Sequence, residues 1–386
     1  MENNFDLKKY DKKVALNYNF LASKKPESFS GAAWALYGET CHFSAGQKFP
    51  ENADAAFEKI RSCLSGGKCG NLNGGKNGDL NGGENDDFSV TALSEALLAV
   101  IEYAVAFGGE GAFLCAEKIC VALREKIEER GAELSAGEKC FISNAFSAYH
   151  CATNDEKAKA ECLKILNEFG LLSESFAKSL AEFLSDEISP EELARLAKSA
   201  LDMSVSAGEQ KYKAFAAEAL NYCLTKGLSL NYAAKNSFKN ASYTSAAATS
   251  VLFSLCVKFY KITGDGKYSY FARRMWYNGL QFCQRAEGGA GEDSVACGEN
   301  RYLQVTRYLN DRDGCYLAEA LAVYFKNKHI FAESGGDITR DKSGRILMGD
   351  KIFAFDESGF FGKDLIEIPT MTAFDKDVAL QLRLKI

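Results

Sequence analysis

Acidic and basic side chains gather in one stretch of this 386-residue chain, where they could carry out acid–base chemistry. Positions 287–313 hold six carboxylates and three arginines, interrupted by glycines. Cleavage of a glycosidic bond needs two carboxyl groups, one protonated as the acid and one acting as base or nucleophile. The catalytic candidates are Glu292, Glu299 and Asp313. The alternative is a solvated acidic loop whose charges only form local ion pairs.

Side chains suited to binding a sugar lie in and just before the same stretch. Trp276 and Tyr302 could present aromatic faces to a sugar ring, and Arg301 and Glu287 could bind its hydroxyl groups. For Trp276 the alternative is packing in a core, which is the usual fate of an aromatic residue on the apolar stripe of a helix.

A predicted helical hairpin precedes this stretch and must position it. Apolar residues at spacings of three and four predict a helix over 244–262 and a second over 268–283. Between them, Gly264 suits the left-handed position that closes a helix, and Asp265 can cap the next one. A connection this short makes the two helices antiparallel neighbours.

The hairpin is one of several in an internal repeat. Residues 208–212 resemble residues 264–268, 56 positions later, and earlier helix pairs turn near Gly108 and Asn154. Ser189, followed by Pro190, predicts a capped helix start. Stacked hairpins with long polar loops at one end favour an all-α fold, a closed α/α toroid of repeated helical hairpins. An open solenoid is the alternative.

Two segments of the chain differ in composition from the helices. We expect a toroid over residues 1–334, interrupted by a flexible Gly- and Asn-rich insertion at 65–87. No strand precedes that insertion and no Gly-Lys-Ser/Thr follows it, so it does not predict a nucleotide site. Alternating apolar residues between turn residues predict a small β-hairpin appendage over 335–386.

Composition limits the partners and the compartment. The net charge of −6 and the scattered basic residues argue against nucleic acid as a partner. A polar, acidic N-terminus and the lack of a long apolar run predict neither a signal peptide nor a membrane span. The spacing of the thirteen cysteines matches no metal-binding or redox motif. It indicates buried, reduced thiols in a cytoplasmic protein. The sequence indicates no oligomeric state.

The hairpin and the loop after it resemble a family of sugar-cleaving enzymes. The segment 259–268, the pair Trp276 and Asn278, and the Gly-rich segment 287–291 look like six-hairpin glycoside hydrolases, most of all the zinc–cysteine β-L-arabinofuranosidases. The resemblance implies an α/α toroid with β additions. It also implies zinc ligands at Asp313 and Cys315 and an acid/base residue at Glu299.

This chain departs from that family in ways that bear on its activity. It has no cysteine after Cys315, so the family's later nucleophile motif is missing, and Asp313 stands where the family has Glu. Two ligands alone would make an incomplete zinc site, and no other cofactor is expected. We therefore expect a toroid that hydrolyses a small glycan. The alternatives are a catalytically degenerate toroid that binds a carbohydrate or a protein, and a helical interaction scaffold.

Overall fold

The computed structural model describes most of the helical part of the chain. The described residues are 4–25, 27–45, 52–65, 88–169, 187–229, 232–239, 241, 243–280, 283–284, 288–294, 306–327, 330, 338–340, 346–348 and 351–353. For 4–13, 277–278, 291–294, 306–310, 338–340, 346–348 and 351–353 only the backbone is described. Nearly all of the predicted insertion at 65–87 lies outside the described residues. So does the segment at 173–185, which the sequence pattern also predicts to be a helix.

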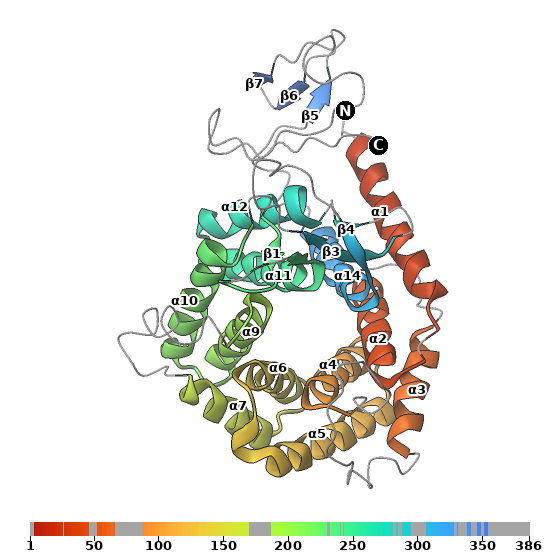
Figure 1. The fold of residues 1–386 in the computed structure, drawn as a ribbon, viewed down its shortest axis with the longest axis vertical. Coiled ribbons are helices and arrows are strands. Elements are labelled where there is room, and N and C mark those ends of the chain that lie inside the picture. Colours follow the sequence, from red (N-terminus) through yellow and green to blue (C-terminus); the bar gives the residue numbers. More distant parts are fainter. Residues whose placement is uncertain are drawn as a thin grey trace.

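Six helices of the described chain form a closed inner ring. Each packs against the next, and the last packs against the first (Figure 1). In ring order they are α2 (Phe29–Ser44), α4 (Val90–Phe107), α6 (Ala136–Thr153), α9 (Pro190–Ser206), α11 (Ala246–Thr263) and α14 (Asp311–Lys326). The segment at 30–37, whose pattern fits a helix or a buried strand, lies within α2.

An outer layer of helices surrounds the ring, and one of the described outer helices packs on each inner helix. Helix α1 packs on α14, and the other outer helices each pack on the inner helix next to them in the chain. They are α1 (Asn4–Ser23), α3 (Ala53–Ser65), α5 (Glu110–Arg130), α7 (Glu156–Glu168), α10 (Gln210–Lys226) and α12 (Gly266–Arg274). The fold is therefore the predicted α/α toroid, in its closed form.

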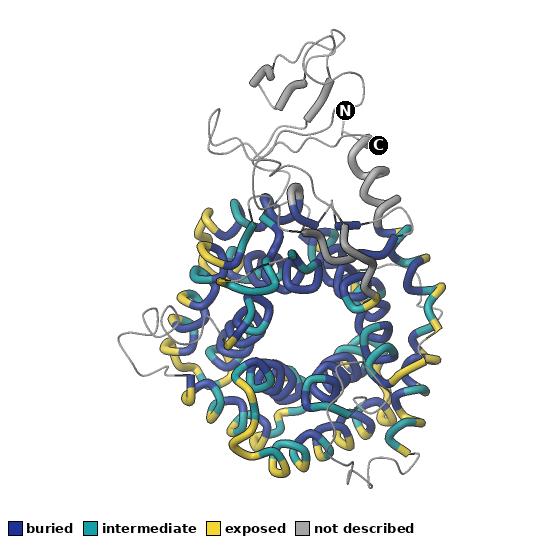
Figure 2. The backbone as a smooth tube through the Cα atoms, in the orientation of Figure 1, coloured by how far each residue is buried: buried dark blue, intermediate teal, exposed yellow. Residues whose placement is uncertain are grey.

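Burial follows the two layers. The inner helices are mostly buried, whereas the outer helices expose their outward faces (Figure 2). Helices α4 and α11 are long and apolar enough to cross a membrane, but about two-thirds of each helix is buried inside the protein. Their apolar character is explained by packing on both sides of an inner helix.

The predicted caps form at the hairpin turns. Gly264 closes α11 in the left-handed conformation with φ of 70°, and the side chain of Asp265 accepts a hydrogen bond from the amide of Lys267 in α12. Ser189 and Glu192 form a reciprocal capping box at the start of α9, with Pro190 at its first position. Local sequence thus sets where these helices begin and end.

Two small sheets accompany the helices. The first is antiparallel in the order β1 (Ala234–Lys235), β2 (Tyr243–Ser245), β3 (Ala290–Ser294), β4 (Thr306–Asn310). The segment at 285–312, expected to be loop, thus contains two strands, because β3 pairs with both β2 and β4. Strands β5 (Ile338–Arg340), β6 (Ile346–Met348) and β7 (Lys351–Phe353) form the second sheet. A π-helical segment, Met275–Leu280, follows α12.

The closure of the ring generates a stability prediction at Gly38. A Cβ there would lie 2.9 Å from the carbonyl oxygen of Cys315, where α2 meets α14. We expect Gly38→Ala to lower the free energy of unfolding by about 1–3 kcal/mol through overpacking. Gly111→Ala is the control, because nothing lies within 4 Å of its added Cβ. Denaturant unfolding of both variants checks this, and equal stabilities would contradict a tight contact at the closure.

Candidate functional site

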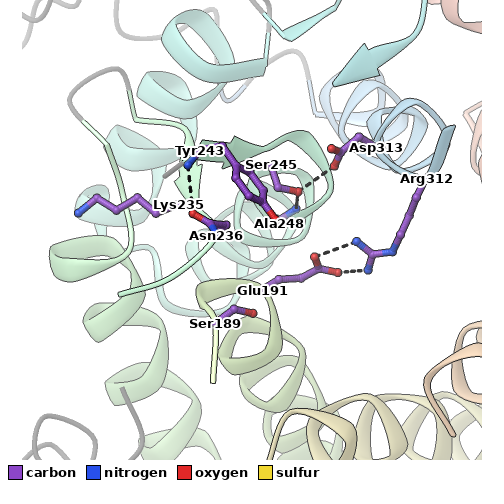
Figure 3. A pocket seen from close by; sticks show the side chains of 9 residues that line it. All are labelled: Ser189, Glu191, Lys235, Asn236, Tyr243, Ser245, Ala248, Arg312 and Asp313. Carbon is purple, nitrogen blue, oxygen red and sulfur yellow. Dashed lines mark hydrogen bonds and ion pairs between the residues drawn. The ribbon is translucent and has the colours of Figure 1, made fainter. Parts of the chain in front are cut away.

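A polar cavity lies at the end of the ring where the inner helices begin. Its volume is about 170 Å³. Figure 3 shows the side chains that line it. The start of α9, the strand region before α11 and the first turn of α14 supply its walls. The lining residues are Ser189, Glu191, Lys235, Asn236, Tyr243, Ser245, Ala248, Arg312 and Asp313. Hydroxyl, amide, carboxyl and guanidinium groups thus converge on a single small space.

Arg312 forms one wall of the cavity and reaches across the ring. From the first turn of α14 its Nη1 atom donates to Glu191 Oε2 of α9 at 3.0 Å, and its Nη2 atom pairs with Glu191 Oε1. Its Nε atom donates to Glu95 Oε1 of α4 at 2.9 Å. Figure 3 shows the two-pronged pair with Glu191. One side chain therefore ties three inner helices together.

A second arginine completes the charge balance. Arg195 of α9 donates from Nε and Nη2 to Glu191 Oε1 at 3.0 and 2.8 Å. Its Nη2 atom lies 3.9 Å from Glu95 Oε1, and its Nη1 atom donates to Asn144 Oδ1 of α6 at 3.3 Å. The guanidinium also stacks over the ring of Tyr316, 4.9 Å from the centroid. Two arginines and two glutamates thus form a neutral cluster, which we call the axial cluster.

Aromatic side chains satisfy the remaining acceptor positions of Glu95. Trp34 of α2 donates from Nε1 to Glu95 Oε2 at 2.7 Å, and the hydroxyl of Tyr316 donates to Oε1 at 3.1 Å. The axial cluster with these partners draws on five of the six described inner helices. Buried charges are tolerated in proteins when they are paired and hydrogen-bonded in this way.

The axial cluster determines the ionisation of Glu191. Burial alone would raise its pKa, but the charges of Arg312 and Arg195 and their hydrogen bonds outweigh burial and lower it to about 2. Glu191 is therefore an ionised carboxylate on the cavity wall at any ordinary pH.

Asp313 has the opposite ionisation behaviour on the same cavity. It is 2% exposed, and burial raises its pKa to about 6. Its Oδ1 atom accepts from the backbone N–H of Ala247 at 2.6 Å and from Ser245 Oγ at 2.8 Å, which opposes the rise. Asp313 thus caps the first turn of α11 and carries a proton that titrates near neutral pH.

A second polar layer lies deeper in the ring. Trp34, Glu95, Arg195 and Arg312 meet at the axial cluster, and the residues seven positions after each are Cys41, Glu102, Asp202 and Glu319. Seven residues rise about 10.5 Å along a helix and return to nearly the same face. Lys198 lies at this deeper level. Burial would lower its pKa, but the charges of Glu319, Glu102 and Asp202 raise it.

Two of the residues predicted from sequence have other roles. Trp276 is 1% exposed and stacks on Tyr324 at 3.9 Å between centroids, so it is a core residue. This corrects its prediction as a sugar platform, since its ring is enclosed by protein. Cys315 packs with Phe20 and Leu21, and burial raises the pKa of its thiol, which favours the protonated form.

Asp313 and Cys315 do not fit the implied zinc site. Asp313 is engaged with the start of α11, and the thiol of Cys315 lies in an apolar cluster. Within the part of the chain that is described, no three His, Cys, Asp or Glu residues are arranged to hold a metal ion. The side chain of Glu292 lies outside the described residues, and so do Glu287, Glu299, Arg301 and Tyr302 entirely.

Sequence reasoning missed Glu95, Glu191 and Arg195, although a signal was present. The charged residues of helix α4 are Glu95 and Glu102, which lie seven positions apart on one face. A charged residue that recurs on the most apolar face of an inner helix indicates a buried polar site.

The axial cluster predicts a large cost for removing one arginine. In Arg195→Met, Glu191 loses one of its two cationic partners while it stays buried. We expect the free energy of unfolding to fall by about 3–5 kcal/mol. Arg61→Met is the matched control, because its pair with Glu58 is exposed and such pairs contribute about 0–1 kcal/mol. Similar losses in the two variants would contradict a tightly coupled cluster.

The raised pKa of Asp313 predicts a pH-dependent stability difference. Folding favours the protonated form of Asp313. The stability that this proton contributes is therefore complete below the unfolded pKa near 3.8 and is lost as pH rises through about 6. Between pH 3 and pH 8 the free energy of unfolding of the wild type should fall by about 3 kcal/mol relative to that of Asp313→Asn. Urea unfolding of both proteins across this range measures it. Parallel curves would show that Asp313 has an ordinary pKa.

With this geometry established, comparisons with known proteins identify the fold. No protein-family model and no curated protein matches the sequence. A cellobiose 2-epimerase from Bacillus thermoamylovorans is similar in structure, with a TM-score of 0.54 and 12% identity over 76% of this chain and 87% of that one. A family 76 α-mannanase from Bacteroides thetaiotaomicron has a TM-score of 0.54 and 12% identity, covering 86% and 98% of the two chains.

A third structure, described as a glycoside hydrolase, has a TM-score of 0.58 and 12% identity, covering 80% of this chain and 58% of that chain. Identities this low show the fold alone. The finer resemblance to β-L-arabinofuranosidases stays a prediction, since the matching structure has a TM-score of 0.48. The chain has the six-hairpin toroid fold found in glycoside hydrolases and sugar epimerases.

Proposed function

We propose that this protein is a carbohydrate-active enzyme of the glycoside hydrolase type, with Asp313 as its proton donor. The observation that carries the proposal is the contrast between two carboxyl groups on one cavity. Asp313 has a pKa of about 6, whereas that of Glu191 is about 2. Two carboxyl groups with pKa values separated by their surroundings are the arrangement that acid-catalysed glycoside cleavage uses.

The two carboxyl groups would then act at different points of the reaction. Asp313 protonates the glycosidic oxygen as the leaving group departs. Glu191, ionised but held by Arg312 and Arg195, is too weak a base to take a proton from water. Because the axial cluster is neutral as a whole, Glu191 would bind sugar hydroxyl groups as a hydrogen-bond acceptor rather than stabilise a charge. Glu292 and Glu299 remain the candidates for the carboxylate that activates water or attacks the sugar.

The cavity suits a small sugar. Ser189, Asn236, Tyr243 and Ser245 line it with hydroxyl and amide groups that pair with sugar hydroxyls. Its volume of about 170 Å³ is smaller than the roughly 300–1,000 Å³ of sites for drug-sized ligands. The substrate unit at this position is therefore of monosaccharide size. The structural neighbours named as glycoside hydrolases and as an epimerase act on sugars, which supports the substrate class.

One observation favours a second candidate function, a toroid that binds a carbohydrate without cleaving it. Each carboxyl group described at the cavity also has a structural partner: Glu191 pairs with two arginines and Asp313 caps α11. A degenerate site would keep these contacts for folding and still bind a sugar through the hydroxyl and amide groups.

Hydrolysis of a panel of aryl glycosides, arabinofuranosides included, tests the proposal. We expect Asp313→Asn to lower kcat by about 10²–10⁴, because the proton donor is lost. Asp311→Asn is the control, since its side chain is 59% exposed and pairs with Lys24. Wild-type kcat should fall as pH rises above about 6, where Asp313 loses its proton.

Glu299→Gln belongs in the same assay, because it tests the residue that the family resemblance assigns as acid/base. Sugar binding that survives in Asp313→Asn, together with no turnover by the wild type on any glycoside, would replace the enzyme proposal by the binding one. Equal turnover in Asp313→Asn and Asp311→Asn would refute Asp313 as the acid.

A further inference from the structure

Asn17, on the outer helix α1, bonds to the backbone at the site while lying outside the cavity lining. Its side chain is fully buried. Its Nδ2 atom donates to the carbonyl oxygen of Gly288 at 2.9 Å and to that of Gly314 at 3.0 Å. Gly314 directly follows Arg312 and Asp313, and Gly288 lies two residues before β3. One amide thus joins the two backbone segments that lead into the site.

The glycines at these positions let α1 approach closely. A Cβ on Gly288, whose φ is +93°, would lie 1.9 Å from the carbonyl oxygen of Leu16. A Cβ on Gly314 would lie 2.5 Å from the ring of Phe20, and one on Gly289 would lie 2.7 Å from the same ring. Helix α1 therefore sits directly on the backbone of α14's first turn and of the segment before β3.

His42 of α2 fixes the orientation of the Asn17 amide. Its Nε2 atom lies 2.8 Å from Asn17 Oδ1. Two carbonyl acceptors require the NH₂ end of Asn17 to face the glycines, so Oδ1 faces His42 and Nε2 must carry a hydrogen. Burial lowers the pKa of His42 to about 4, which keeps the imidazole neutral in this tautomer. The pair is a preorganised clamp of two buried side chains.

We propose that Asn17, oriented by His42, is a positioning residue that sets the first turn of α14 and thereby the placement of Arg312 and Asp313. The inference rests on the proposed function for its catalytic consequence. The N-terminal helix is then part of the functional unit, because it holds the backbone that carries the proton donor. Misplacement of a catalytic group by about 1 Å can cost about 10²-fold in rate.

The test compares three substitutions on α1 and α2 with a matched asparagine. Asn17→Leu removes the clamp, His42→Leu removes its orienting donor, and His42→Gln supplies an amide donor in place of the imidazole. Asn52→Ala is the control. Its Nδ2 atom also ties α1 to the body of the protein, through the carbonyl of Ala22 at 2.6 Å, five residues after Asn17 in the chain.

Two measurements are made on each protein: the titration midpoint of the Asp313 carboxyl carbon by ¹³C NMR, and kcat and KM on a glycoside that the wild type cleaves. We expect Asn17→Leu and His42→Leu to lower the midpoint by about one pH unit, towards the value of a solvated carboxyl group. Their kcat should fall by about 10–100-fold with little change in KM. His42→Gln and Asn52→Ala should keep the wild-type midpoint.

A wild-type midpoint in Asn17→Leu would overturn the positioning role, and so would equal shifts in Asn17→Leu and Asn52→Ala, which would indicate general loosening. If Asn17→Leu does not fold, the two His42 variants decide instead. Equal titration midpoints in His42→Leu and His42→Gln would overturn the positioning role. The titration needs no turnover, so it separates this inference from the proposed function. A wild type that cleaves no glycoside but shows the expected shifts would refute the enzyme proposal alone.

Discussion

The guanidinium group of Arg312 is largely enclosed in the ring, with its side chain 20% exposed, and much of the site depends on how its charge is neutralised there. Its partners are Glu95 on α4 and Glu191 on α9, so their hydrogen bonds hold three inner helices in register. An unpaired buried charge costs several kcal/mol, whereas a paired and hydrogen-bonded one is tolerated. The hydrogen bonds that neutralise Arg312 also hold Glu191 in place, so they form one wall of the cavity.

Stability alone does not account for four charges inside a ring of apolar helices. Replacing a buried ion network by apolar residues of similar volume is often neutral or stabilising. The polar pattern also continues one layer deeper, at Glu102 and Glu319, with Lys198 at the same level. A ring that only had to fold would have an apolar interior. A charged interior beneath a polar cavity is consistent with the carbohydrate site proposed above.

The sequence predicted the architecture well because the architecture depends on local signals. Caps at Asp265 and Ser189, the left-handed Gly264 and the spacing of apolar residues are all local, and each forms as expected. Repetition of the hairpins then made a toroid the natural assembly. The strands at 290–294 and 306–310 were missed because they exist through pairing with β2, which is distant in sequence.

The site was predicted only in part, because its members are brought together by ring closure. Asp313 was identified from the acidic stretch, and the structure places it on the cavity. Glu191 and Arg312, which pair on the same cavity, lie 121 positions apart in sequence, and no local pattern connects them. Trp276 was misassigned because periodicity shows that an aromatic residue lies on a helix face but not whether that face meets a ligand or a neighbouring helix. Composition around a loop could therefore suggest chemistry but could not assemble the site.

The structural and chemical roles proposed for Asp313 are linked through one carboxyl group. The hydrogen bonds from Ala247 and Ser245 favour its ionised form, whereas burial favours the neutral form, and a pKa of about 6 reflects both effects. A sugar that entered the cavity would displace water and strengthen the effect of burial, which raises the pKa further. Substrate binding would then favour the protonated form that the reaction needs, and product release would restore water and the ionised form.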